Sequence, residues 1–187
     1  MFMLILSIQE YKHVQMVYST GYTPNILYSE YIYLSPRYTE AYMKMAEELI
    51  KKDGTGNPLS FFWGWIKNPY LDFYALKGTR DKVGLFVEVP ENRVLVSDYD
   101  RYCAYLDEEV DHLTLVNHGQ CLQGVFKKIS PSNIISVVEL KDLMKLYRKG
   151  HTSLSELYNL SRVKDIKYRT DIFSLPDYSF NLGLVSM

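Results

Sequence analysis

The order of apolar and polar segments predicts an α+β domain with a mixed, mainly antiparallel sheet and helices packed against it. Short apolar runs, such as residues 3–8 and 134–140, are typical of strands. Residues 36–52 have the periodicity of a helix with one apolar face. Strands and helices do not alternate in the regular β-α-β order of a doubly wound parallel sheet. With 187 residues, 47% of them hydrophobic, the chain can bury a core as one domain, or as one domain with an appendage.

In the first half of the chain, the patterns predict a buried strand at 3–8, a helix at 9–19, a loop at 22–29, a second strand at 31–34 and a helix from Pro36. The aromatic run at 59–66 fits either a strand or a short buried helix, because periodicity does not separate the two over so few residues.

The helix from Pro36 has the clearest signals. Ser35 is suited to cap its first turn, and proline at the first helical position loses no hydrogen bond. Ala41, Met45 and Leu49 repeat every four residues, so we expect them to face the core.

In the second half, the patterns predict strands at 83–89, 93–96, 121–129 and 134–140, helices at 99–109 and 141–149, and a short helix after the capping box Ser153-x-x-Glu156. Within the strand at 93–96, Leu95 and Val96 are expected to be buried.

We divide the chain into a core domain at 1–140 and a basic helical C-terminal extension at 141–187 that packs on the core. Residues 141–169 hold eight Lys or Arg against three acids. These residues resemble a helix-turn-helix in outline, or they dock on the acidic segment 87–111, which holds eight acids against two arginines. From residue 168 onward the pattern is irregular.

The composition excludes several classes of protein. A net charge of −1 provides no general attraction for nucleic acid. No apolar run reaches the about 20 residues that span a membrane, and the apolar start lacks the features of a signal peptide, so we expect a cytoplasmic protein. Two cysteines are too few for a disulfide framework, and neither they nor the four histidines have metal-ligand spacing, so no metal site is expected.

Two clusters have both a structural and a functional interpretation. In the segment Ser97-Asp98-Tyr99-Asp100, either Ser97 or Asp98 caps the helix that follows, or the two carboxylates hold a cation or act as acid and base. The aromatic side chains of 61–65 belong to the core, or they form a stacking platform for a base or a nicotinamide ring. The structural interpretation is the commoner one in both cases.

Six segments form a wider pattern, at 38–45, 61–65, 68–72, 89–100, 123–129 and 134–139. Together they resemble the bacterial and phage family known as domain of unknown function 3841, over residues 3–140. The most specific piece is Val94-Leu-Val-Ser-Asp-Tyr-Asp100, after the tryptophan-rich stretch. This resemblance implies no activity.

The order of elements is also similar to the ADP-ribosyltransferase fold, whose strands bear a three-part signature. His or Arg grips the dinucleotide, Tyr or Ser shapes the nicotinamide pocket, and Glu or Gln stabilises the oxocarbenium-like sugar. Tyr33 and Ser35 match the second position and Gln123 matches the third, so the resemblance implies that these are the catalytic residues. Residues 3–9 contain neither His nor Arg for the first position.

Two hypotheses follow. The first is a bacterial or phage accessory protein with an ADP-ribosyltransferase-like core, either a divergent enzyme that uses NAD or a pseudoenzyme. The alternative is a non-enzymatic binding protein, such as a phage inhibitor of a host defence complex, which contacts another protein through its tyrosine-rich surface or its acidic segment 87–111. Seventeen tyrosines favour this alternative, because tyrosine is common at binding hot spots.

Overall fold

The computed structural model describes residues 1–20 and 23–167. Its strands and α-helices are, in chain order, β1 (Phe2–Glu10), α1 (Tyr11–Thr20), α2 (Pro36–Lys52), β2 (Phe62–Lys67), α3 (Asp72–Lys77), β3 (Lys82–Pro90), β4 (Leu95–Asp98), α4 (Tyr99–Leu106), β5 (Leu122–Phe126), β6 (Ile134–Glu139), α5 (Leu140–Tyr147) and α6 (Leu154–Ser161). The fold is therefore α+β, as predicted. The strands form one six-stranded sheet in the order β4-β5-β2-β1-β3-β6, in which neighbouring strands are antiparallel.

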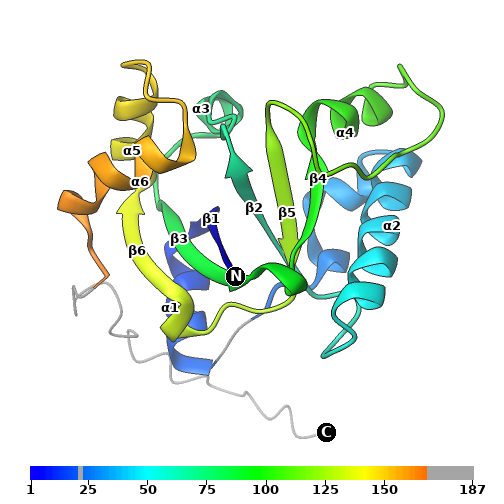
Figure 1. Cartoon of the computed structure of the whole chain (residues 1–187), viewed down its shortest axis with the longest axis horizontal. Helices are drawn as coiled ribbons and strands as arrows, with labels where there is room; N and C mark the ends of the chain where they lie inside the picture. Colours follow the sequence, from blue (N-terminus) through cyan, green and yellow to red (C-terminus); the bar gives the residue numbers. More distant parts are fainter. Residues whose placement is uncertain (21–22, 168–187) are drawn as a thin grey trace, which may run out of the picture.

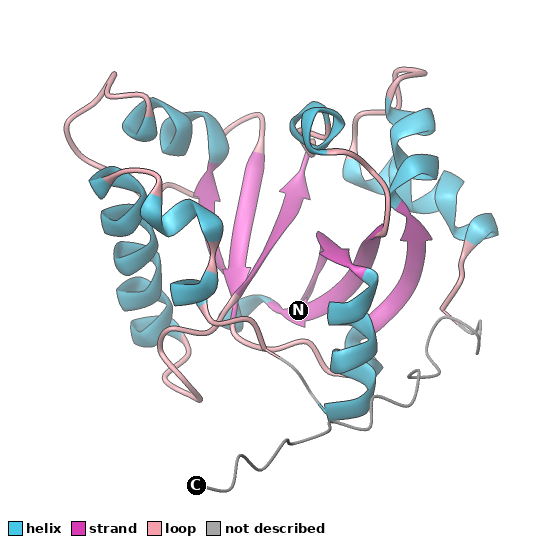
Figure 2. Cartoon of the chain, turned by 180° about the vertical axis from the view of Figure 1, so that it is seen from behind, coloured by secondary structure: helices cyan, strands magenta, loops and turns pink. Residues whose placement is uncertain are grey.

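The central strand β1 pairs very differently with its two neighbours. It pairs with β3 over nine positions, from Phe2 opposite Pro90 to Glu10 opposite Lys82. It pairs with β2 only where Leu6 lies opposite Trp65. Figures 1 and 2 show the result, a β1-β3-β6 half and a β4-β5-β2 half that diverge from each other.

The two faces of β1 pack against different helices, because neighbouring side chains of a strand point to opposite faces. Ile5 belongs to an apolar cluster with Val14 and Val17 of α1. Leu6, on the other face, packs in a cluster with Leu143 of α5 and Leu157 of α6. Figure 1 places α5 and α6 beside the β6 edge of the sheet, and α2 and α4 beside the β4 edge.

Helix α2 forms where the sequence predicts it. The Ser35 side chain accepts a hydrogen bond from the Tyr38 backbone N–H at 3.4 Å, which satisfies a donor of the first turn. Ala41, Met45 and Leu49 are fully buried, as predicted.

The strand predicted at 31–34 is wrong. These residues lie in a 3-10 helix, η2 (Glu30–Tyr33), whose first turn is capped by the Ser29 side chain. Ile32 is buried, whereas Tyr33 is 77% exposed. A run of four apolar residues between two serines that can cap a helix fits such a turn as well as a strand, because it is too short to show a period.

Other predicted elements differ in extent. The aromatic run at 59–66 includes the strand β2, and α3 was not predicted. Helix α4 ends at Leu106 rather than at 109, because Glu108 adopts a left-handed backbone conformation with φ 64°. Leu95 and Val96 are only partly buried, so the expectation that both lie in the core is wrong.

The described part of the C-terminal extension packs on the β1-β3-β6 half. Leu143, Met144, Leu154 and Leu157 join the cluster that contains Phe86 of β3. The prediction that these helices dock on the acidic segment 87–111 is wrong for the part of that segment that forms α4. Helix α4 follows β4, which is the opposite edge strand from β6. The division at residue 140 and the helix-turn-helix outline stay predictions, and residues 168–187 lie outside the described residues.

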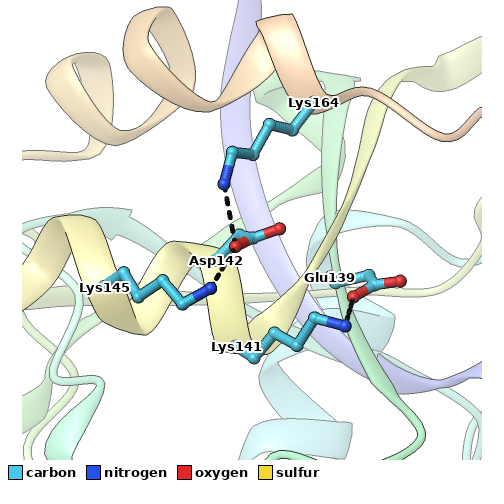
Figure 3. A network of polar contacts seen from close by, with 5 residues as sticks. All are labelled: Glu139, Lys141, Asp142, Lys145 and Lys164. Carbon is cyan, nitrogen blue, oxygen red and sulfur yellow. Dashed lines mark hydrogen bonds and ion pairs between the residues drawn. The ribbon is translucent and has the colours of Figure 1, made fainter.

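Charged side chains connect the elements of this extension (Figure 3). The Asp142 carboxylate accepts hydrogen bonds from Lys145 at 3.0 Å and from Lys164 at 2.9 Å. Lys164 belongs to the 3-10 helix η5 (Arg162–Lys164), so Asp142 links α5 to the segment after α6. A further ion pair joins Lys141 to Glu139.

Among the residues that the structure describes, the helices are all too short or too polar to cross a membrane.

Candidate functional site between the diverging strands

A cavity of about 630 Å³ lies where β1 and β2 diverge. Its walls come from β1, α1, α2, β2, α3, β3, α4 and β5, and also from the segment at 24–31. The volume is in the range of sites for small molecules and cofactors. The cavity is therefore a consequence of the sheet topology, since a β2 paired along all of β1 would leave no gap.

A large part of the wall is aromatic. Trp63 and Trp65 lie two residues apart on β2, so both side chains stand on the same face of the strand. Trp63 packs against Tyr102 of α4 at a ring distance of 5.4 Å, and Trp65 packs against Tyr99 at 4.8 Å. Phe62 points to the other face and stacks on Phe126 in the apolar core. The aromatic run thus contributes both to the core and to the cavity wall.

The tyrosines of the wall keep their protons. Burial raises the pKa of Tyr74, Tyr99 and Tyr102 above the usual value for a phenol. These side chains are therefore neutral at physiological pH, and the aromatic wall has no charge of its own.

The two thiols near the cavity are not activated nucleophiles. Burial raises the pKa of Cys121 to about 12 and also raises the pKa of Cys103. A reactive cysteine needs a lowered pKa, because the thiolate is the nucleophile.

Polar side chains of β5 and β1 flank β2, which lies between these two strands. Gln123 of β5 lines the cavity and is 4% exposed. It lies directly opposite Trp65 in the sheet. On β1, the Ser7 hydroxyl donates to the Trp63 carbonyl at 2.6 Å, and the Gln9 amide donates to Ser7 Oγ at 2.9 Å.

Charged residues line the cavity at the end of β1 and the start of β3. Glu10 and Lys12 form an ion pair at 2.7 Å, and Lys82 lies opposite Glu10 in the sheet. A hydrogen bond from Lys12 holds the pKa of Glu10 below its usual value. Burial lowers the pKa of His13, which is therefore neutral at pH 7. This end of the cavity can meet an anionic part of a ligand.

The structure separates the three residues predicted to be catalytic. Gln123 lines the cavity, but Tyr33 and Ser35 do not. Tyr33 points to solvent and its hydroxyl donates to the Leu27 carbonyl at 2.9 Å. Ser35 is occupied as the cap of α2.

Sequence reasoning missed the two α4 tyrosines, Tyr99 and Tyr102, and gave no site role to Trp63 or Trp65 individually. One signal for the tryptophans was available, because their spacing of two residues predicts a shared face if the run is a strand. Tyr99 and Tyr102 gave no such signal, since they come to the cavity only through the packing of α4.

The acidic cluster at 97–100 acts as a helix cap. The Asp98 carboxylate is buried and accepts from the Arg101 backbone N–H at 2.9 Å, while Asp100 is exposed. In residues 1–20 and 23–167, no three His, Cys, Asp or Glu side chains come together as a metal site needs. The arrangement favours the capping interpretation of this cluster.

Comparisons of the chain with family models, with curated proteins and with solved structures found no match.

Proposed function

We propose that the chain is an accessory protein with an ADP-ribosyltransferase-like core that binds the nicotinamide end of NAD in the cavity between β1 and β2. The observation that carries the proposal is the position of Gln123, which lies opposite Trp65 on the uncharged, aromatic part of the cavity wall. The resemblance implies that the third signature residue lies on a strand and stabilises the sugar, and Gln123 of β5 would take this part.

The lining of the cavity favours binding without efficient transfer. During transfer of ADP-ribose, positive charge develops on the oxocarbenium-like sugar, and a preorganised group must stabilise this charge. Glu10 is the acidic residue that lines the cavity, and its carboxylate is already paired with Lys12. Gln123 is uncharged, and β1 supplies neither His nor Arg within 3–9. The pseudoenzyme is therefore the preferred form of the proposal.

Isothermal titration calorimetry with NAD tests this function. We expect binding to the wild type, and Gln123→Leu should weaken it by about tenfold, because one hydrogen bond to the ligand is lost. Tyr33→Ala is the matched control, since Tyr33 lies outside the cavity, and its affinity should equal that of the wild type. A folded wild-type protein that gives no heat at millimolar NAD would contradict the proposal.

One observation favours the alternative, a binding protein. Three neighbouring apolar side chains are exposed near η2, with exposed fractions of 40% for Leu27, 77% for Tyr33 and 64% for Leu34. Exposed apolar patches of this kind are common at protein interfaces. We propose that a partner protein, if the chain acts by binding one, contacts this patch.

The alternative predicts that substitution of Tyr33 weakens binding of the partner and that substitution of Gln123 does not. A partner purified with the wild type from native cells should be lost with Tyr33→Ser and Leu34→Ser, and retained with Gln123→Leu. Lys substitutions at Glu108 and Glu109 test the acidic segment in the same assay. Retention of the partner by every surface variant would reject both surfaces.

A further inference from the structure

Two buried donors in the cavity wall have no hydrogen-bond partner among the described residues. They are the indole N–H of Trp63 and the side-chain amide nitrogen of Gln123. Both residues line the cavity, and Gln123 is 4% exposed. Buried donors are almost always paired in folded proteins, so two unpaired donors in one cavity need an explanation.

The sheet register places these two donors side by side. Trp63 lies opposite Val125, and Trp65 lies opposite Gln123. Trp63 and Gln123 are therefore diagonal neighbours on the same face of adjacent antiparallel strands, within reach of long and aromatic side chains. A small planar ligand in this part of the cavity would therefore face both residues.

The chemistry of the two groups favours a carboxamide. The Gln123 amide has donors and an acceptor, whereas the Trp63 indole has only a donor. The carbonyl oxygen of a ligand carboxamide would accept from both donors, and its N–H group would donate to the Gln123 carbonyl oxygen.

A carboxylate fits the same place poorly. It accepts but does not donate, so it leaves the Gln123 oxygen facing another oxygen. It would also bring a charge against the neutral tyrosines Tyr99 and Tyr102, and burial of an unpaired charge is unfavourable. The basic residues of the lining, Lys12 and Lys82, belong to the other end of the cavity near Glu10.

We infer that Trp63 and Gln123 form a recognition pair that selects a planar heteroaromatic carboxamide over the matching carboxylate. The inference rests on the proposed function for the dinucleotide, but it concerns a specificity that nicotinamide binding alone does not require.

The experiment compares four probes by calorimetry: NAD, nicotinic acid adenine dinucleotide, benzamide and benzoate. We expect the wild type to prefer each amide over its acid by on the order of tenfold or more. Trp63→Phe keeps an aromatic ring and Gln123→Met keeps the length of the side chain, and both remove the donor, so each should bring the preference close to one. A preference is a ratio within one protein sample, so a partly unfolded variant does not imitate this result.

Ser136→Ala is the matched control. Its hydroxyl is also buried without a partner among the described residues, but Ser136 does not line the cavity. The preference should therefore stay at the wild-type value. A reduced preference in this variant would mean that the readout follows general stability, and would overturn the inference.

The outcomes separate this inference from the proposed function. If NAD and its acid analogue bind equally, the recognition pair is rejected and the dinucleotide function stands. If NAD does not bind but benzamide binds better than benzoate, the dinucleotide function is rejected and the pair stands. If none of the four probes binds, both are rejected.

Discussion

The two halves of the sheet use β1 in opposite ways. In the β1-β3-β6 half, β1 pairs with β3 at nine positions, and Val83, Leu85, Phe86 and Val87 of β3 are fully buried. In the β4-β5-β2 half, β1 meets β2 at one position, and the space beside it is walled by tryptophan and tyrosine. Continuous pairing thus goes with an apolar core, and interrupted pairing goes with a cavity.

This contrast shows why the chain has so many tyrosines. Tyrosine has an apolar ring that packs and a hydroxyl that remains compatible with a wet or ligand-filled space. Aliphatic side chains would leave a wall of the same size without hydrogen-bonding groups. Six of the 17 tyrosines line the space where the sheet opens, and stability should depend less on this wall than on the fully buried core.

Truncation of one core phenylalanine and one phenylalanine of the cavity wall gives the largest expected difference. Phe86 is fully buried and packs against Tyr158 at a ring distance of 5.2 Å, so Phe86→Ala should cost about 3–5 kcal/mol. Phe73 lines the cavity and is only partly buried, so Phe73→Ala should cost about 1 kcal/mol. Urea denaturation measures both values. Equal losses would show that the cavity wall contributes as much to stability as the core.

Gly64 is the point at which the two halves touch most closely. A Cβ atom there would lie 2.2 Å from Ile5 Cγ2 and 3.1 Å from the Leu6 carbonyl oxygen. Gly64→Ala should therefore push β1 and β2 apart and cost about 1–3 kcal/mol. Gly54→Ala is the control, because its Cβ would meet only an ordinary contact at 3.6 Å. If Gly64→Ala is as stable as Gly54→Ala, the junction is looser than the structure indicates.

Asp98 holds the start of α4, and α4 supplies Tyr99 and Tyr102 to the cavity wall. Asp98→Ala should cost about 0.5–2 kcal/mol, and Asp98→Asn should recover most of it, because asparagine also caps. Magnesium or calcium should leave the melting temperature unchanged. A rise in melting temperature with either ion, lost in both Asp98→Asn and Asp100→Asn, would support a metal site instead of a cap.

The sequence predicted correctly those features that depend on residues close together in the chain. The cap at Ser35, the apolar repeat of Ala41 and Met45 in α2, and the cap at Asp98 were all confirmed. Each depends on residues within about one turn, and the capping preferences are strong.

The cavity could not be predicted, because it depends on how strands distant in sequence pair. Trp63 and Gln123 are separated by 60 residues in the chain, and only the register of β2 with β5 makes them neighbours. Tyr33 was assigned to a site through a strand that does not form, since a run of four residues has too few positions to show a period. The assignment of Gln123 rested on a resemblance, and its position on the cavity wall followed from packing that the sequence pattern does not contain.

Substitution of Asp142 tests whether the stability of the β1-β3-β6 half depends on its apolar core rather than on surface charge. Burial alone would raise the pKa of Asp142, but hydrogen bonds from Lys164 and Lys145 outweigh it and hold the pKa below its usual value. The folded protein therefore binds fewer protons at this site than the unfolded chain. The resulting stabilisation is complete above about pH 4 and is lost as the pH falls through the lower pKa of the folded state.

Both lysines are more than half exposed, so we expect the contribution to be small. Asp142→Asn should lower the free energy of unfolding by about 0.2–1 kcal/mol at pH 7 and by almost nothing near pH 2. A double-mutant cycle with Lys164→Met, measured by urea denaturation at low and high salt, gives the coupling energy directly, and salt should reduce it. A loss as large as that of Phe86→Ala would mean that the ion pairs stabilise this half as much as its apolar core does. A loss that persists at pH 2 would mean that the effect of Asp142 does not come from its charge.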